Sequence, residues 1–258
     1  MSTRTAVHAV AHETMTLLLS PAGASAALLI LPPAGLLTGM GMVTAYGEFH
    51  GLDLPDRLLL HQDGGYSEIF EYFLTGSSAL AMLAVWHRTR IAAYMVLALF
   101  FGWLTADNSL QMHENAGVWL AAAARSTGLA ATHANHYGEA LFMTFYAGLL
   151  CGALWVTRTI GPGVHRARVL LVVGVLACAS FFGLAVDLLD SVVLQPGTAP
   201  HALGTFVEDA GEFWSFNLAA VIVWAICAHH GRGHAPHPRG RSGYADPSSG
   251  RLISDPPL

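Results

Sequence analysis

The residues of this sequence that are best suited to chemistry are carboxylates that interrupt apolar stretches. The segment Trp103–Glu114 places Asp107 and Glu114 at the end of a long apolar run. On a continuous helix, Asp107, Gln111 and Glu114 would stand at positions i, i+4 and i+7, and therefore on one face. Because ionisable groups at membrane depth are energetically costly, they usually mark a functional site. The segment therefore predicts a site without identifying its reaction or ligand.

Matching polar groups occur near one end of four other apolar segments. The residues that we predict to join Asp107 are Glu68, Glu71, His136, Glu139, Asp187, Glu208 and Glu212. Carboxylate oxygens and neutral imidazole nitrogens are both good metal ligands. A shared site requires that the segments carrying these residues lie side by side. Whether the residues meet therefore depends on the structure and direction of these segments.

The composition indicates that these segments cross a membrane. Of the 258 residues, 53% are apolar and 11% are charged, whereas about 25% of the residues in soluble domains are charged. Six apolar segments have the length of about 20 residues that a bilayer requires. They are Ala22–Tyr46, Tyr66–Trp86, Ile91–Met112, Asn135–Val156, Ala167–Leu189 and Phe206–Ala228. The predicted fold is an all-α, multi-pass bundle of six transmembrane helices.

The arginines predict the orientation of this bundle. All twelve basic residues are arginine, and only Arg57 and Arg125 lie in the connections on one side of the six segments. Cytoplasmic loops are enriched in basic residues, so the other side, which carries both termini, is predicted to be cytoplasmic. We expect a protein of the inner cell membrane with a cytoplasmic arm (1–21), a transmembrane domain (22–229) and a disordered cytoplasmic tail (230–258).

This orientation gathers acidic residues at the outer ends of the helices. Of the seventeen acidic residues, those that fall in the arm or the tail are Glu13, Asp246 and Asp255. Carboxylates in the first turn of a helix are stabilised by free N–H groups and by the helix dipole. This local effect is a sufficient explanation for Glu68, Glu139 and Glu208.

Four other carboxylates are the stronger indication of a site. Asp107, Glu114, Asp187 and Asp190 are expected near helix C-termini, where the dipole disfavours negative charge and capping does not explain them. Converging carboxylates repel one another, so the site needs raised pKa values, a bound cation or exposure to water. The leading hypothesis is a metal or other cation, and the alternatives are a proton-relay cavity and a water-filled acidic vestibule.

The metal hypothesis assigns a role to each candidate residue. The predicted ligands are Asp107, Glu139, Asp187, Glu212 and His136, with Glu68, Glu71 and Glu208 as further candidates and Glu114 as general base. Carboxylates with one to three histidines suit Zn, Mn or Fe, whereas an all-oxygen site suits Ca. A dinuclear carboxylate site needs Glu-x-x-His on paired helices, but the sequence has the reverse order, His136-Tyr-Gly-Glu139. His113 would point about 120° away from the Asp107 face unless the helix has already ended.

These motifs carry a family resemblance. The pattern Asp107-Asn-Ser-Leu-Gln-Met-His113-Glu114, followed by His136 and Glu139, then Val186-Asp187, then Glu208-Asp209, resembles a group of uncharacterised bacterial multi-pass membrane proteins with a similar D…HE and ED arrangement. The resemblance covers Tyr66–Ala228. It implies that these residues form one constellation and brings no activity with it.

Composition also excludes several function classes. The sequence contains no lysine, which excludes a retinal Schiff base, a pyridoxal phosphate site and a P-loop. A net charge of −5 argues against a nucleic-acid partner. The expected partners are the lipid bilayer and either a second copy of the chain or another membrane-complex subunit. The predicted function is an outward-facing cation site, with a metal-dependent membrane enzyme as one version. A proton- or cation-coupled transporter or sensor and an accessory subunit are the alternatives.

Overall fold

The computed structural model describes residues 3–52, 54–60, 62, 64–126, 134–156, 163–194 and 198–232. Regular secondary structure in these ranges is entirely helical, which confirms the all-α prediction. The elements are α1 (Thr3–Leu18), α2 (Pro21–Phe49), the short helix η1 (Asp56–Leu58), α3 (Tyr66–Thr89), α4 (Ala92–Leu110), α5 (Met112–Ser126), α6 (Ala134–Val156), α7 (Gly163–Ser180), η2 (Phe181–Val186), α8 (Asp187–Val193) and α9 (Ala199–Arg232).

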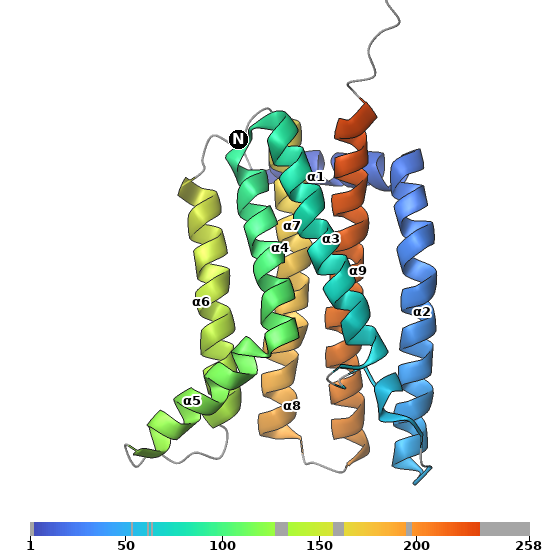
Figure 1. The fold of residues 1–258 in the computed structure, drawn as a ribbon, viewed down its shortest axis with the longest axis vertical. Helices are drawn as coiled ribbons and strands as arrows, with labels where there is room; N and C mark the ends of the chain where they lie inside the picture. The colour runs from blue at the N-terminus through green and yellow to red at the C-terminus, as the bar shows by residue number, and fades with distance from the viewer. Residues whose placement is uncertain are drawn as a thin grey trace, which may run out of the picture.

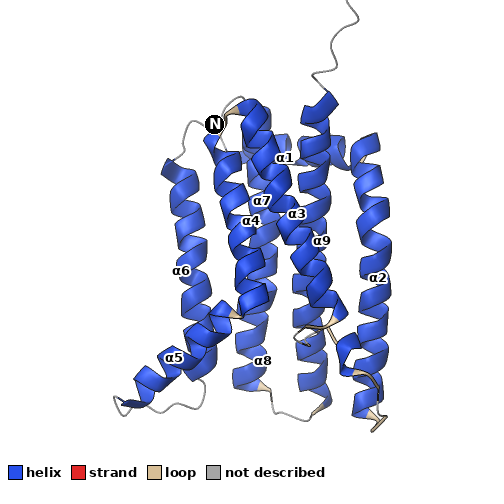
Figure 2. Cartoon of the chain, viewed as in Figure 1, coloured by secondary structure: helices blue, strands red, loops and turns tan. Residues whose placement is uncertain are grey.

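The long helices stand side by side and alternate in direction (Figures 1 and 2). In Figure 1, α2, α4 and α7–α8 run downward, and α3, α6 and α9 run upward. The end at which α4 meets α5 is called the acidic end here, because Asp107, Asp187 and Glu208 lie there. At the opposite end, called the α1 end, α1 lies across the bundle and α9 finishes.

Helix α9 occupies the centre of the packing. It contacts α2, α3 and α7, and α3 also packs along α4. Tyr94, Phe101 and Ile226 are fully buried in the resulting core, while Leu28 and Leu80 point outward and are 74% and 69% exposed. Apolar side chains on the outer surface are typical of a bundle surrounded by lipid, in which association depends on close packing between helices.

Five helical spans are long and apolar enough to cross a membrane. They are Pro21–Gly47, Tyr66–Thr89, Tyr137–Trp155, Gly163–Leu189 and Ala199–Gly231. They correspond to five of the six predicted segments. The remaining predicted segment, Ile91–Met112, corresponds to α4, whose last turn carries the polar residues Asp107, Asn108 and Ser109 and which is not among these five spans.

The helix predicted across Asp107 and Glu114 is in fact two helices. α4 ends at Leu110, Gln111 adopts a left-handed conformation with φ of 51°, and α5 begins at Met112. The expectation that Asp107, Gln111 and Glu114 share one helical face is therefore wrong. Figure 1 shows α5 turning away from the direction of α4 toward the foot of α6. This turn places His113 back beside the end of α4.

The helix that approaches the acidic end from α7 contains a π-helical stretch. α7 passes into η2 at Phe181, and α8 continues from Asp187. A π-helical turn widens the helix and often occurs at functional sites. Here the π-helical stretch is followed directly by Asp187, a candidate ligand.

The predicted arm and tail border the bundle. Residues 1–21 contain α1, which is joined to the start of α2 through Ser20. α9 extends through His230 to Arg232, and residues 233–258 of the predicted tail lie outside the described residues.

Candidate functional site

Asp107 links the end of α4 to the first turn of α5. Its side chain is fully buried, and its Oδ1 accepts the backbone N–H of His113 at 3.0 Å. Its Oδ2 lies 3.1 Å from Nδ1 of the His113 ring. Because the first N–H groups of a helix have no partner within it, Asp107 caps α5. The expectation that capping does not explain Asp107 is thus wrong, although the residue capped lies in the next helix.

The same contact sets the protonation of His113. Burial acts to lower the pKa of His113, but the hydrogen bond and charge of Asp107, together with the charges of Glu114 and Glu212, outweigh burial and raise it above its ordinary value of 6.5. The His113 side chain is 28% exposed. Asp107 therefore favours the imidazolium form of a histidine that faces the candidate site.

Glu114 occupies a different electrostatic position from the one expected. It was predicted near a helix C-terminus, but it lies in the first turn of α5. The helix dipole is favourable to a carboxylate there. Glu114 Oε1 is 3.9 Å from Nε2 of His113, so His113 lies between the carboxylates of Asp107 and Glu114.

A cavity of about 180 Å³ lies on the side of the site nearest α6. We call it the α6-side cavity. Its carboxylates come from three elements, and they are Glu139, Asp187, Glu208 and Glu212. His113 and Asn108 also line it. Four of the predicted ligands therefore share one cavity.

A second cavity, of about 140 Å³, lies on the side nearest α3 and is called the α3-side cavity. Its carboxylates are Glu68, Glu71, Glu114, Asp209 and Glu212. Asn108 and His113 line it as well. The two cavities therefore share Glu212, His113 and Asn108. Among the described residues that line them, none is an arginine.

Glu212 is positioned by the π-helical stretch. A Cβ atom added to Gly183 would lie 2.5 Å from Oε2 of Glu212 and 3.0 Å from its Cδ. A side chain at this position would displace the carboxylate from where it lies. On the far side of the same seam, a Cβ on Gly211 would lie 2.2 Å from the ring of Phe182. Gly183 in η2 thus leaves space for Glu212 of α9, and Gly211 in α9 leaves space for Phe182 of η2.

Not every predicted residue faces the site in the same way. The carboxylate of Glu68 accepts the backbone N–H of Gly64, just before α3, as expected for a capping residue. His136 lies in α6, but its side chain is outside the described residues. The histidine that the structure places in both cavities is His113, which sequence reasoning had left in doubt because a continuous helix would turn it away.

The described ranges contain no group of three or more His, Cys, Asp or Glu side chains arranged to hold a metal ion. The carboxylates line two neighbouring cavities rather than converging on one point. A metal ion at Glu212 would therefore require side chains such as Glu139 and Asp187 to turn inward. Carboxylate and imidazole are donor types that bind divalent cations in proteins.

A second polar cluster lies at the α1 end and was not predicted. Arg168 is 3% exposed, and its Nε donates to Oε1 of Glu13 in α1 at 2.6 Å. Its Nη1 is 2.9 Å from Nε2 of His230 in α9. His230 stacks on His165, whose Nδ1 is 2.9 Å from the hydroxyl of Tyr94. The cluster joins α1, α4, α7 and α9.

Comparison with known proteins identifies one related family. The sequence model of a family described as Domain of unknown function (DUF8692) matches residues 65–230, which is more than half of the chain and includes every residue of the two cavities except Leu60 and Gln62. Neither a curated protein nor a solved structure matches the chain.

Proposed function

We propose that this chain, which belongs to the DUF8692 family, is an inner-membrane protein that binds a cation in the two cavities at its acidic end. One observation carries the proposal. Glu212 lines both cavities, together with carboxylates from α3, α5, α6, α8 and α9, and no arginine of the described ranges lines either cavity. Carboxylates crowded in a partly dry site repel one another, and a bound cation relieves that repulsion.

The proposal includes six transmembrane helices with both termini in the cytoplasm. Helix α4 is the sixth span, because it stands in the bundle beside α3 and contributes the buried residues Tyr94, Leu97 and Phe101 to the core. Ten of the twelve arginines then lie on the cytoplasmic side, leaving Arg57 and Arg125 outside. The cavities open toward the outer side.

In the metal version of this proposal the cation is Zn, Mn, Fe or Ca. Glu139, Asp187, Glu208 and Glu212 are the ligands from the α6-side cavity, and His136 remains a candidate nitrogen ligand. A metal bound there would polarise a substrate or activate water. Glu114, held beside His113, is the candidate general base. Asp107 is a positioning residue for His113 rather than a ligand, because both of its oxygens are already engaged.

Elemental analysis and calorimetry test the metal version. Purified full-length protein should retain a divalent metal or bind one after stripping, and Glu212→Gln and Asp187→Asn should weaken binding by about tenfold or more, since hydrogen bonds and contacts to charged groups contribute about 1.5–3 kcal/mol. Asp56→Asn, which removes an exposed carboxylate in η1, is the matched control. Wild-type protein that binds none of Zn, Mn, Fe or Ca would contradict it.

A transporter or sensor is the second candidate, and one observation favours it. Within the described part of the bundle, the buried Ser78 Oγ and Asn217 Oδ1 have no hydrogen-bond partner. Buried polar atoms without partners are rare and often mark water or ion sites. Both residues lie on helices that contribute to the cavities, α3 and α9. Uptake of a cation into proteoliposomes, abolished in Asn217→Leu but not in Leu218→Ala, would support transport over enzymatic activity.

A further inference from the structure

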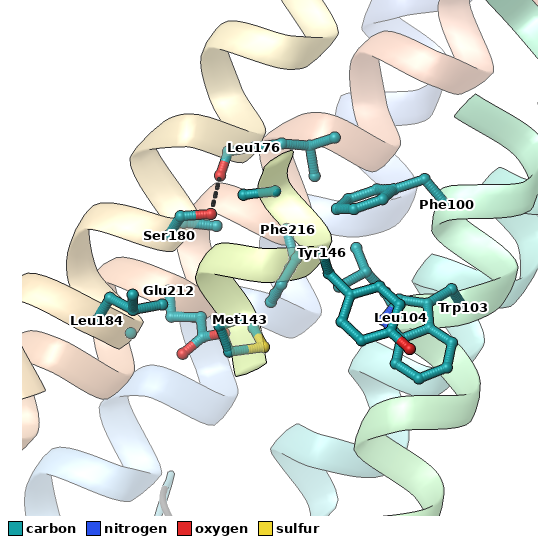
Figure 3. A pocket seen from close by; sticks show the side chains of 13 residues that line it. Phe100, Trp103, Leu104, Met143, Tyr146, Leu176, Ser180, Leu184, Glu212 and Phe216 are labelled. Atoms are coloured by element: carbon teal, nitrogen blue, oxygen red, sulfur yellow. Dashed lines mark hydrogen bonds between the residues drawn. The ribbon is translucent and has the colours of Figure 1, made fainter. Parts of the chain in front are cut away.

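A third cavity lies deeper in the bundle and shares Glu212 with the other two. Its volume is about 30 Å³, and its lining includes the rings of Phe100, Trp103, Tyr146 and Phe216. We call it the aromatic pocket. Figure 3 shows the carboxylate of Glu212 beside Met143, with Phe100, Trp103 and Tyr146 across the pocket. Trp103 and Tyr146 stack on each other with ring centroids 3.9 Å apart.

We propose that the aromatic pocket and Glu212 together bind the ammonium group of a small organic cation that carries apolar substituents. The inference rests on the proposed function, because it assumes that Glu212 binds cations. It goes further by naming a class of ligand. The ligand's charged group would lie against Glu212, with its methyl or methylene groups among the aromatic rings.

The continuity of the cavities is the first support. The aromatic pocket and the α6-side cavity share Leu104, Met143, Gly183, Leu184, Glu212 and Phe216. A molecule that reaches Glu212 from the α6-side cavity therefore meets the aromatic pocket without crossing another element.

Charge is the second support. Among the residues that the structure describes, Glu212 is the only carboxylate that lines the aromatic pocket, and no arginine or histidine lines it. Such a site has a negative charge beside aromatic rings, which attract cations through the ring quadrupole. Quaternary ammonium groups are bound in this way elsewhere, since their methyl groups suit an apolar wall and their charge suits the rings. A hydrated metal ion would gain nothing from these walls.

Size is the third support. A volume of about 30 Å³ accommodates two or so water molecules by the measure in which one molecule needs roughly 10–15 Å³. That is room for one or two methyl groups of an ammonium head whose remainder lies in the α6-side cavity, but not for an acyl chain. The ligand is therefore a small amine or ammonium compound rather than a lipid tail.

Calorimetric titration of the full-length protein in nanodiscs tests this inference. The probes are (2-hydroxyethyl)trimethylammonium and its uncharged carbon isostere 3,3-dimethylbutan-1-ol. The charged probe should bind at least about tenfold more tightly than the isostere, a difference of about 1.4 kcal/mol, because its charge gains the desolvated cation–π and carboxylate contacts. Glu212→Gln should remove this preference, and Trp103→Leu should weaken the charged probe alone.

Matched controls distinguish an effect on the binding site from an effect on folding. Phe181→Leu changes an aromatic ring that is 58% exposed on the adjoining π-helical stretch and should leave binding unchanged. The comparison of the two probes on wild-type protein needs no variant, so it stands even where Glu212→Gln fails to fold. Equal binding of both probes, or no binding of the charged probe, overturns the inference.

The outcome is distinguishable from that of the metal version. Divalent metal binding without ammonium binding overturns this inference and leaves the metal version intact. Ammonium binding without metal binding supports this inference and overturns the metal version. Binding of neither class overturns both.

Discussion

Asp107 and His113 show how much depends on a single contact. The carboxylate of Asp107 accepts two hydrogen bonds from His113, one from the backbone and one from the ring. These bonds join the end of α4 to the start of α5 and hold His113 at the boundary of the two cavities. The pair is therefore structural and at the same time sets the charge of the site.

The pair predicts a pH dependence of stability. The pKa of His113 is raised above its ordinary 6.5, so its stabilising contribution is fully present below pH 6.5 and is lost as the pH rises through the raised pKa. Thermal unfolding of the purified protein should show this loss in wild type and not in His113→Gln, which should be destabilised by about 1–3 kcal/mol at low pH.

His8→Gln serves as the matched control for that experiment, because His8 is an exposed histidine on α1. It should keep the wild-type pH profile. A His113→Gln variant with the same profile as wild type would show that the pair does not titrate in this range.

Gly183 makes a second prediction at the residue scale. A Cβ at this position would contact the carboxylate of Glu212, and the flexible end of that side chain would move aside rather than the backbone. Gly183→Ala should therefore weaken cation binding several-fold while changing thermal stability little. Calorimetry with whichever cation wild type binds measures the effect, with Gly174→Ala as control, because a Cβ there meets nothing within 4 Å. Unchanged affinity in Gly183→Ala would mean that Glu212 is not the binding group.

At the scale of elements, the Glu13–Arg168 contact fixes α1 across the end of the bundle. Both side chains are buried. Removing one partner of a buried ion pair leaves an uncompensated charge and costs about 3–5 kcal/mol, whereas replacing both with apolar residues is often neutral. Glu13→Leu should therefore lower the thermal unfolding temperature sharply, and the double variant with Arg168→Met should recover most of the loss.

Arg166→Met is the control for this pair, because Arg166 lies two residues from Arg168 but is exposed. It should leave stability close to wild type. If the double variant is no more stable than Glu13→Leu alone, the contact has another role, such as the link from Arg168 to His230.

Helices were predictable where a long apolar run determines them. The breaks between helices were not predictable. Apolar runs predicted helices over α2, α3, α4, α6, α7 and α9 because each run approaches the length of a bilayer. The predicted segment Ile91–Met112 ends within two residues of the end of α4 at Leu110, but the left-handed break at Gln111 was not predicted, because the residues through Glu114 are ordinary in helices. The termination of α4 depends on Asp107 and His113, whose contact exists only once the chain has turned.

The site was predictable to the same extent. Residues at corresponding ends of helices meet when the helices alternate in direction, which is why Glu139, Asp187, Glu208 and Glu212 line one cavity, while their role as ligands stays a prediction. The cluster at the α1 end was not foreseen, because Glu13 and Arg168 are 155 residues apart and Tyr94 lies in an apolar run. Nothing in local spacing connects such residues.

At the scale of the whole molecule, the topology is the main open test. Six spans with an N-in and C-in orientation predict that reporter fusions at either terminus are cytoplasmic. A fusion inserted after Arg57 should report the outer side. A reporter that places the two termini on opposite sides would mean that α4 does not cross the membrane, leaving the five spans Pro21–Gly47, Tyr66–Thr89, Tyr137–Trp155, Gly163–Leu189 and Ala199–Gly231.

The π-helical stretch also fixes the register of the candidate site. Each residue advances an α-helix by about 100°, so one additional residue between α7 and Asp187 rotates everything after it by roughly that angle relative to a straight helix. Asp187 faces the α6-side cavity in this rotated register. The number of residues in η2 therefore determines the direction in which the Asp187 carboxylate points. Shortening η2 by a single residue would turn Asp187 away from Glu212 without altering the chemistry of either side chain.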